Sequence, residues 1–188
     1  IYKMLMSFPE TIDRAGLTAL FPQHRQLFKE QFSTHEEPAE GYRIRRVLTY
    51  GIAESCRGRM VEDVLNGGDI ALYGTLMNVS HDGDRVLFES PEEETKTKSL
   101  DVNKPLYLQP GGYDCSIPEI DRMVDIACEA GAVGAQISGA GLGGSIMALV
   151  RADLVGEVVK RMGELYYRPS GVKENYIVAT AVEGACVV

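Results

Sequence analysis

Apolar and polar residues follow a helical spacing through the first half of the chain. From about Tyr42 to Leu65 the apolar residues recur mostly three or four positions apart, which predicts one long amphipathic helix. Residues 66–68 (Asn-Gly-Gly) end it, because glycine tolerates the left-handed conformation that closes helices. Asp69 then has the place of an N-cap for a second helix. The apolar face of that helix consists of Ile70, Tyr73, Leu76 and Met77. The two helices are expected to form a helical hairpin.

Two more helices are predicted in the second half of the chain. Residues 116–119 (Ser-Ile-Pro-Glu) have the form of a capping box, which opens a helix that runs to about residue 130. Asp153 has the place of an N-cap for a helix that runs to about residue 167, and Pro169 is expected to stop it.

The remaining segments read as strands and loops. Residues 145–151 and 175–182 are rich in strand-forming residues, and residues 185–188 have the pattern of a last short strand. Residues 33–41 are polar and predict a loop or linker, and residues 89–104 contain little that could be buried and predict a solvated or mobile loop. The pattern therefore predicts an α+β fold, with helices packed on one face of an antiparallel sheet and with the helical hairpin added.

Charge and cysteine content narrow the classes of function. The chain has 188 residues and a net charge of −8, which disfavours a nucleic-acid partner, because binding a phosphate backbone needs a cationic face. No apolar stretch approaches a membrane span and no leader pattern opens the chain, so no membrane partner is expected. The four cysteines never form a C-x-x-C pair and predict reduced thiols in a cytoplasmic protein. Because Ile1 is not a methionine, we expect a processed or truncated chain.

Glycine is concentrated between residues 134 and 144 (Gly-Ala-Gln-Ile-Ser-Gly-Ala-Gly-Leu-Gly-Gly). Such density requires positive φ angles or a close approach of backbones. A dinucleotide-binding turn needs a strand before and a helix after the glycines, and here the predicted order is inverted. A P-loop is excluded because no Gly-Lys-Ser/Thr follows. Two interpretations remain: a loop that brings backbone amides and the Ser138 hydroxyl to a ligand, or a tight turn without a ligand.

Three segments resemble the GHMP kinases, which phosphorylate galactose, homoserine, mevalonate and phosphomevalonate. The segments occur along the chain in the same order as in that family. Residues 134–144 are similar to the third conserved motif of that family. Residues 67–81 (GGDIALYGTLMNVSH) and 113–121 (YDCSIPEID) resemble its galactokinase branch. The resemblance covers about residues 42–188 and implies a ferredoxin-like C-terminal domain there, with residues 1–41 as a connecting segment.

The sequence departs from the galactokinase pattern in two places. Gln136, Ile137 and Ser138 stand where galactokinases have Arg, Met and Thr, and the Gly-Ala-Gly that follows is closer to the mevalonate-kinase branch. The chain between His81 and Tyr113 is also longer than usual in galactokinases. Galactose is therefore the leading substrate by resemblance, with a uronic acid, arabinose or another hexose as competitors.

The resemblance implies that two domains each supply part of the kinase site. The family's ATP-binding loop, substrate motif and catalytic aspartate belong to an N-terminal domain that this sequence lacks. That domain would be the partner of this chain, and ATP and Mg²⁺ would bind the full-length enzyme rather than this chain tightly. The chain would contribute the third motif to the substrate and phosphate site and would be inactive alone. The residues implied are Ser138, Gly139, Ala140, Gly141, Leu142, Gly143 and Gly144. A non-catalytic module that binds a small molecule or regulates is the alternative.

Other polar residues receive weaker interpretations. His81, with Asp82 and Asp84 nearby, favours a structural turn over a metal or acid–base site. Asn78 is expected to hold a local turn or helix end. The basic residues at 43, 45 and 46 predict a solvated helix face, with a contact to a nucleotide phosphate as the alternative.

Overall fold

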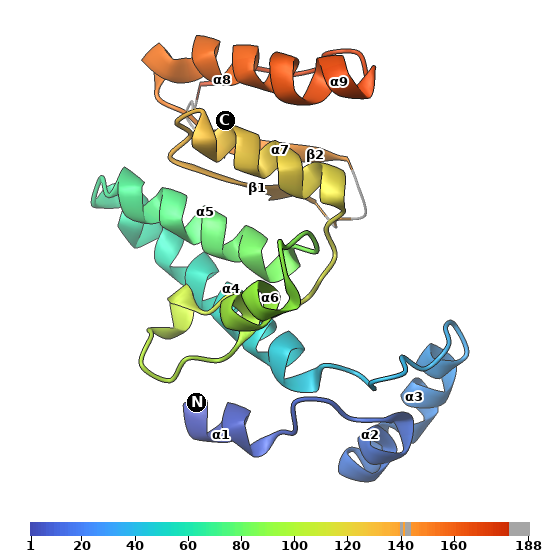
Figure 1. Cartoon of the computed structure of the whole chain (residues 1–188). Coiled ribbons are helices and arrows are strands. Elements are labelled where there is room, and N and C mark those ends of the chain that lie inside the picture. The colour runs from blue at the N-terminus through green and yellow to red at the C-terminus, as the bar shows by residue number, and fades with distance from the viewer. Residues whose placement is uncertain (140, 142–143, 181–188) are drawn as a thin grey trace, which may run out of the picture.

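The structure is a computed structural model, and it describes residues 1–139, 141 and 144–180 (Figure 1). The helices of the described residues are α1 (Tyr2–Ser7), α2 (Arg14–Leu20), α3 (Arg25–Phe32), α4 (Ile44–Asn66), α5 (Ile70–Asp84), α6 (Pro91–Lys98), α7 (Pro118–Glu129), α8 (Val155–Met162) and α9 (Arg168–Ser170). The strands are β1 (Gly134–Ser138) and β2 (Ser145–Leu149).

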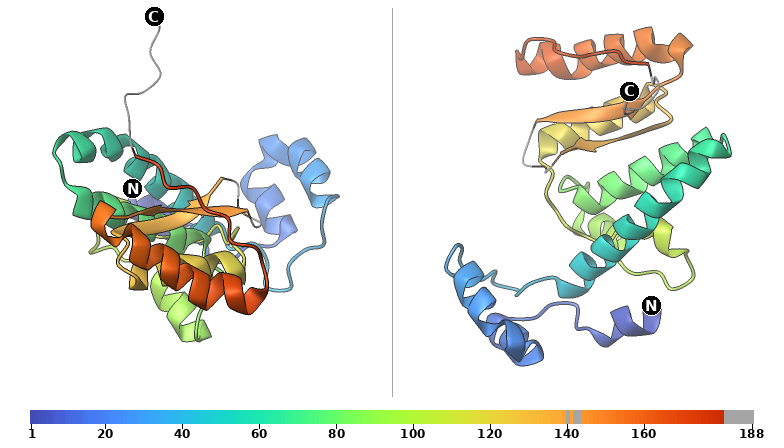
Figure 2. Two further views of the ribbon diagram at one scale, coloured as in Figure 1. Left: turned by 90° about the horizontal axis from the view of Figure 1, so that it is seen from above. Right: turned by 180° about the vertical axis from the view of Figure 1, so that it is seen from behind.

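The predicted helical hairpin is confirmed as α4 and α5, which lie side by side in Figures 1 and 2. Gly68 has a φ of +71°, the left-handed backbone expected where a helix closes. The side chain of Asp69 accepts a hydrogen bond of 2.9 Å from the amide N–H of Leu72, as an N-cap does. Local sequence therefore determines both ends of this connection.

The sheet confirms the predicted α+β class. Within the described residues it has two antiparallel strands, paired from Gly134 opposite Leu149 to Ser138 opposite Ser145. Helix α7 packs against both strands through a core that includes Val124, Ile126, Ala127 and Ala135. Helix α8 packs on α7 from the other side and completes this core with Val158 and Met162.

Helix α5 packs along β1, so the hairpin and the sheet form one structure. The side-chain oxygen of Asn78, in the middle of α5, accepts a hydrogen bond of 2.9 Å from the amide N–H of Ala135. The expectation that Asn78 holds a local turn is therefore wrong, because its partner lies in a strand. Gly74 and Gly134 bring the two backbones into contact: a Cβ built on Gly134 would lie 2.3 Å from the carbonyl oxygen of Gly74.

The prediction of a loop at 89–104 is wrong where a helix forms, and the prediction that this segment is solvated holds for most of its residues. Residues 91–98 form α6, and Lys98 at its end is only 1% exposed. Lys98 is buried because its ammonium group binds the Asp114 carboxylate and its side chain lies against the Phe88 ring. The buried guanidinium of Arg57 also donates to two carbonyl oxygens of this segment, those of Tyr107 and Gln109. The sequence shows neither set of partners.

Two predicted helix caps do not form. The N-cap of α7 is Ile117, and the hydroxyl of Ser116 donates to the Ile117 carbonyl instead of capping the helix, although Pro118 takes the expected first position. The N-cap of α8 is Leu154 rather than Asp153, because a 3₁₀ turn precedes the helix and Asp153 pairs with Arg151. Both helices still begin within two residues of the prediction.

The C-terminal helical region runs further than predicted. A π-helical turn (Gly163–Tyr167) links α8 to α9, and the helix ends at Gly171, whose φ is +69°. Pro169 does not stop the helix, since the wider π turn before it changes the hydrogen-bond pattern that a proline would break.

Residues 175–180 form no strand, so that part of the prediction for 175–182 is wrong. Within the described residues no strand pairs with them, and Ile177 is 91% exposed. Residues 181, 182 and 185–188 lie outside the described residues.

The polar loop at 33–41 is confirmed, since the structure has no helix or strand there. Residues 1–41, expected as a connecting segment, contain α1, α2 and α3.

Candidate functional site

The glycine-rich segment forms a β-hairpin. Its first five residues are β1, and β2 begins at Ser145, opposite Ser138. The sequence analysis placed no strand at 134–138, because a segment rich in glycine and alanine has a weak strand propensity of its own. Pairing with β2 and packing against α5 and α7 supply the stabilisation that the local sequence lacks.

Three glycines between the strands have left-handed backbone. The φ angles are +83° at Gly139, +86° at Gly141 and +106° at Gly144. Glycine adopts these values without the steric cost that a Cβ atom brings. The predicted need for positive φ is therefore confirmed at these three positions.

Gly141 also meets the predicted need for a close approach of backbones. A Cβ atom built on Gly141 would lie 2.3 Å from the carbonyl oxygen of Cys115 and 2.7 Å from its sulfur, which leaves no room for a side chain. A Cβ on Gly139 or Gly144 would meet nothing within 4 Å, and both residues are exposed. The described part of the loop thus presses on Cys115 at one point and faces open space at two others.

The structure describes four of the seven predicted site residues. Ser138 ends β1 and is half-buried, next to the three glycines. Ala140, Leu142 and Gly143 lie outside the described residues.

A buried polar cluster lies directly behind the loop. The Asp84 carboxylate accepts hydrogen bonds of 3.1 Å from the Cys115 thiol and the Tyr50 hydroxyl. Burial raises the pKa of Asp84, although these two hydrogen bonds oppose the rise. Burial and the bond to Asp84 raise the pKa of Cys115 to about 12, and burial also raises the pKa of Tyr50. The thiol and phenol therefore remain protonated donors at neutral pH, so the thiol is no nucleophile there.

His81 lies in the last turn of α5 and is fully buried. Its Nε2 atom lies 3.2 Å from Oδ1 of Asp121, whose Oδ2 accepts the amide N–H groups of Val86 and Leu87 at 2.8 and 2.7 Å. Burial alone would raise the pKa of Asp121, but His81, Ser116 and these amides bring it below its ordinary value. The pair joins α5 to α7 and has no access to solvent, which agrees with a structural role.

The prediction that the basic residues at 43, 45 and 46 form a solvated face is wrong for Arg45 and Arg46, whose side chains are mostly buried, whereas the side chain of Arg43 is 43% exposed. Arg45 donates to the Phe8 carbonyl and pairs with Glu10, while Arg43 and Arg46 both donate to Glu94 at 2.7 Å. These acidic partners come from segments far away in the sequence. Because the three guanidinium groups bind protein groups, they are poor candidates for a phosphate contact.

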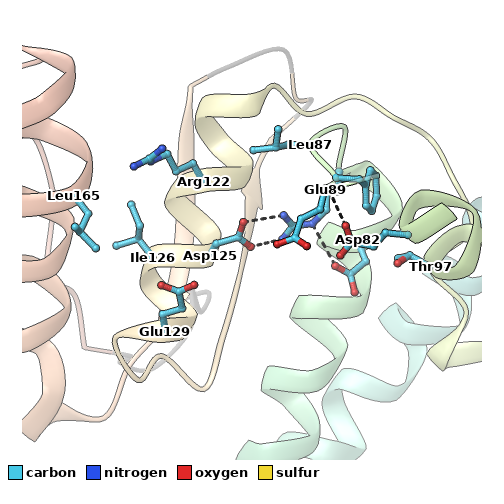
Figure 3. A pocket seen from close by; sticks show the side chains of 12 residues that line it. Asp82, Leu87, Glu89, Thr97, Arg122, Asp125, Ile126, Glu129 and Leu165 are labelled. Carbon is cyan, nitrogen blue, oxygen red and sulfur yellow. Dashed lines mark hydrogen bonds and ion pairs between the residues drawn. The ribbon is translucent and has the colours of Figure 1, made fainter. Parts of the chain in front are cut away.

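A separate cavity of about 750 Å³ lies between α7, α6 and the end of α5 (Figure 3). Its walls are mostly charged, and Asp125 forms a bidentate ion pair with Arg85 inside it, with Asp82 nearby. None of the described glycine-loop residues lines this cavity. Within the described ranges, no group of three or more His, Cys, Asp or Glu side chains could hold a metal ion.

Sequence reasoning missed two residues behind the loop, Asp84 and Cys115, and the buried side chain of Lys98. Asp84 was considered only as a turn residue, and Cys115 only as a scattered thiol. Both stand inside or beside the family-like segments 67–81 and 113–121, which was the available signal. Lys98 stands between these two segments, where no motif marks it.

Comparisons with known proteins agree with the motifs. Residues 60–168 match the model of the C-terminal domain of GHMP kinases. Galactokinase from Mannheimia succiniciproducens is 32% identical over 173 residues, which is 90% of this chain and 37% of that protein. Galactokinase from Haemophilus influenzae is 29% identical over 87% of this chain, and galactokinase from Fusobacterium nucleatum is 28% identical over 73% of it.

The chain spans only 29–37% of the length of these curated relatives. No helix in the described part of the chain is long and apolar enough to cross a membrane. The family model covers more than half of the chain. The matched region includes the glycine-rich hairpin of the chain and its two galactokinase-like segments. The chain therefore belongs to the GHMP kinases, and it carries their C-terminal domain.

Proposed function

We propose that this chain is the C-terminal domain of an ATP-dependent, galactokinase-like sugar kinase in the cytoplasm. In this role the loop between β1 and β2 closes one side of the site for sugar and phosphate. An N-terminal domain supplies the ATP-binding loop, the catalytic aspartate and the Mg²⁺ ligands, and the chain alone transfers no phosphate. The observation that carries the proposal is the loop itself, with exposed left-handed glycines at 139 and 144 beside Ser138.

The chemistry of phosphoryl transfer explains why such a loop is useful. Catalysis of this reaction depends on positioning the phosphates and on stabilising their negative charge. Successive backbone N–H groups in left-handed conformations form concave surfaces that bind anions. A chain with a net charge of −8 needs this kind of donor, because its side chains do not form a cationic face for phosphate. The Ser138 hydroxyl adds a donor that can rotate toward a sugar hydroxyl or a phosphate oxygen.

Substitution of Gly139 tests the role of the loop with a matched control at Gly171. Both residues have positive φ (+83° and +69°), and a Cβ on either would meet nothing within 4 Å. Gly139→Ala and Gly171→Ala should therefore cost a similar backbone strain, about 1–2 kcal/mol each. Only Gly139→Ala places a methyl group on the proposed substrate side. In the full-length protein we expect it to lower kcat/KM at least about tenfold, while Gly171→Ala leaves kcat/KM within about twofold.

The assay follows ADP release with Mg²⁺-ATP and a panel of galactose, arabinose, galacturonic acid and other hexoses. We expect turnover of one of these sugars by the full-length protein and none by the 188-residue chain alone. The proposal fails if the full-length protein phosphorylates no sugar, or if the two alanine variants lose activity equally. Tight metabolite binding by the isolated chain, without phosphate transfer in any form of the protein, would favour the non-catalytic module instead.

A further inference from the structure

Lys98 is a buried lysine in the extra stretch of chain between α5 and α7. Its ammonium group binds the Asp114 carboxylate and donates a hydrogen bond of 2.6 Å to the carbonyl oxygen of Arg85. The ammonium also lies 5.3 Å from the centre of the Phe88 ring, within the range of a cation–π contact. A buried ammonium needs such partners, because burial without them is strongly unfavourable. Lys98 therefore links the end of α5 to the segment before α7.

Asp114 has an unusual backbone conformation. Among the described residues it is the one non-glycine residue with a positive φ, at +59°. Residues other than glycine enter this left-handed region at a steric cost, so surrounding contacts must hold them there. The amide N–H groups of Tyr113 and Asp114 both donate to the carbonyl oxygen of Gly83, at 2.8 and 3.2 Å, and Lys98 holds the side chain. Arg43 lies 3.5 Å from the same carboxylate but is 43% exposed, so it contributes less.

The turn at Asp114 directs the next residue against the glycine loop. The carbonyl oxygen and sulfur of Cys115 occupy the space where a side chain on Gly141 would lie. The thiol also donates to Asp84, and the amide N–H of Ser116 donates to the Asp84 carbonyl oxygen at 2.9 Å. A chain of direct contacts therefore runs from Lys98 through Asp114 and Cys115 to Gly141.

We propose that Lys98 is a positioning residue that holds the glycine loop in place through Asp114 and Cys115. The catalytic consequence rests on the proposed function, but the mechanical link does not. Lys98 lies between His81 and Tyr113, where the chain is longer than the usual galactokinase spacing. Lys98 itself makes no contact with the described loop residues, so its effect on the reaction is through geometry.

Thiol labelling of the chain tests the mechanical link. Cys115 is shielded by Gly141 and Asp84, and its raised pKa slows reaction with maleimide. We expect Lys98→Met to speed labelling of Cys115 roughly tenfold or more, as read by mass spectrometry of each cysteine-containing peptide. Unchanged labelling of Cys56 and Cys128 in the same sample excludes general unfolding as the cause.

Three further substitutions separate the link from a general loss of stability. Arg43→Met removes the exposed partner of Asp114 and should leave Cys115 labelling within about twofold of the unmodified chain. Asp114→Gly supplies the left-handed backbone without help from a side chain. It should therefore return Cys115 in the Lys98→Met background to slow labelling, whereas Asp114→Ala in that background should not. The inference is overturned if Lys98→Met leaves Cys115 protected, if Cys56 and Cys128 are labelled faster together with Cys115, or if Gly and Ala at position 114 behave alike.

The full-length kinase supplies the second readout. A misplaced loop changes the geometry of the reaction more than the binding of the sugar, and a misplacement of about 1 Å can cost about 100-fold in rate. We expect Lys98→Met to lower kcat roughly 10-fold to 100-fold with a smaller change in KM, and Asp114→Gly to restore part of kcat. If labelling responds as expected but the full-length protein has no kinase activity, the proposed function fails and the link stands. If the protein is an active kinase and Cys115 labelling is unaffected by Lys98→Met, the link fails alone.

Discussion

The contact between Gly74 and Gly134 gives the sharpest stability prediction for this fold. Gly74 lies inside α5, and a Cβ atom built on it would lie 2.2 Å from the carbonyl oxygen of Val133 and 2.6 Å from the carbonyl carbon. Ordinary contacts of a Cβ atom begin at about 3.4 Å. Gly74→Ala therefore forces α5 away from β1 by roughly an ångström, because the obstructing atoms belong to backbone and cannot rotate away.

The magnitude follows from three contributions. Overpacking of a well-packed contact costs about 1–3 kcal/mol. The displacement also stretches the 2.9 Å hydrogen bond between Asn78 and Ala135, which is worth about 1 kcal/mol. Replacing glycine by alanine inside a helix returns about 1 kcal/mol. The net loss is about 1–3 kcal/mol, and at about 2–4 °C per kcal/mol for a domain of this size Tm falls by roughly 2–12 °C.

Gly51→Ala is the matched control for this prediction. Gly51 lies inside α4, and a Cβ on it would meet nothing within 4 Å, so only the helix-propensity term remains. We expect Gly51→Ala to raise the free energy of unfolding by about 1 kcal/mol. Thermal and urea unfolding followed by circular dichroism measure both variants. If Gly74→Ala is as stable as the unmodified chain, the close approach of α5 and β1 does not exist as described.

Three further predictions concern buried polar groups. Arg57→Met leaves the Tyr107 and Gln109 carbonyl oxygens unpaired, so the free energy of unfolding should fall by about 1–3 kcal/mol, and chymotrypsin should cut faster after Tyr107; unchanged urea unfolding would contradict this. Because the pKa of Asp121 is lowered in the folded chain, its carboxylate stabilises the fold at pH values above the ordinary carboxylate pKa of about 3.9. This stabilisation is lost as pH falls through the folded pKa. The stability difference between the unmodified chain and Asp121→Asn should therefore shrink in acid. Asp84 has the opposite sign: its pKa is raised, so the unmodified chain should gain stability over Asp84→Asn as pH falls from neutral toward about 4, and a difference that is constant with pH would refute it.

Local patterns were sufficient for most of the helical framework. The limits of α4 and the start of α5 follow from helical spacing, the Gly67-Gly68 turn and the cap at Asp69, and all three form as predicted. The need for left-handed backbone at 139, 141 and 144 could also be inferred. A high density of glycine is unfavourable in regular structure unless the backbone needs a positive φ or a close approach. These features depend on neighbours within a few residues, which the sequence displays directly.

Features that depend on distant partners could not be predicted. A lysine in a polar stretch predicts a solvated side chain, and only the position of Asp114 and the Arg85 carbonyl makes Lys98 a buried one. Arg43 and Arg46 were misjudged for the same reason, because their partner Glu94 lies about 50 residues away in the sequence. Residues 175–180 have strand-forming side chains, but a strand requires a paired neighbour, and the structure gives them none.

The sequence alone thus determined α4, α5, α7 and α8, the glycine turn and the family resemblance, since each rests on local spacing or on a short motif. The tertiary structure decided which charges are buried and which backbones touch, because the free energy of a buried charge or a backbone contact depends on atoms that folding brings from elsewhere in the chain. The contact of Cys115 with Gly141 is of the second kind, and it connects the polar stretch before α7 to the loop on which the proposed function depends.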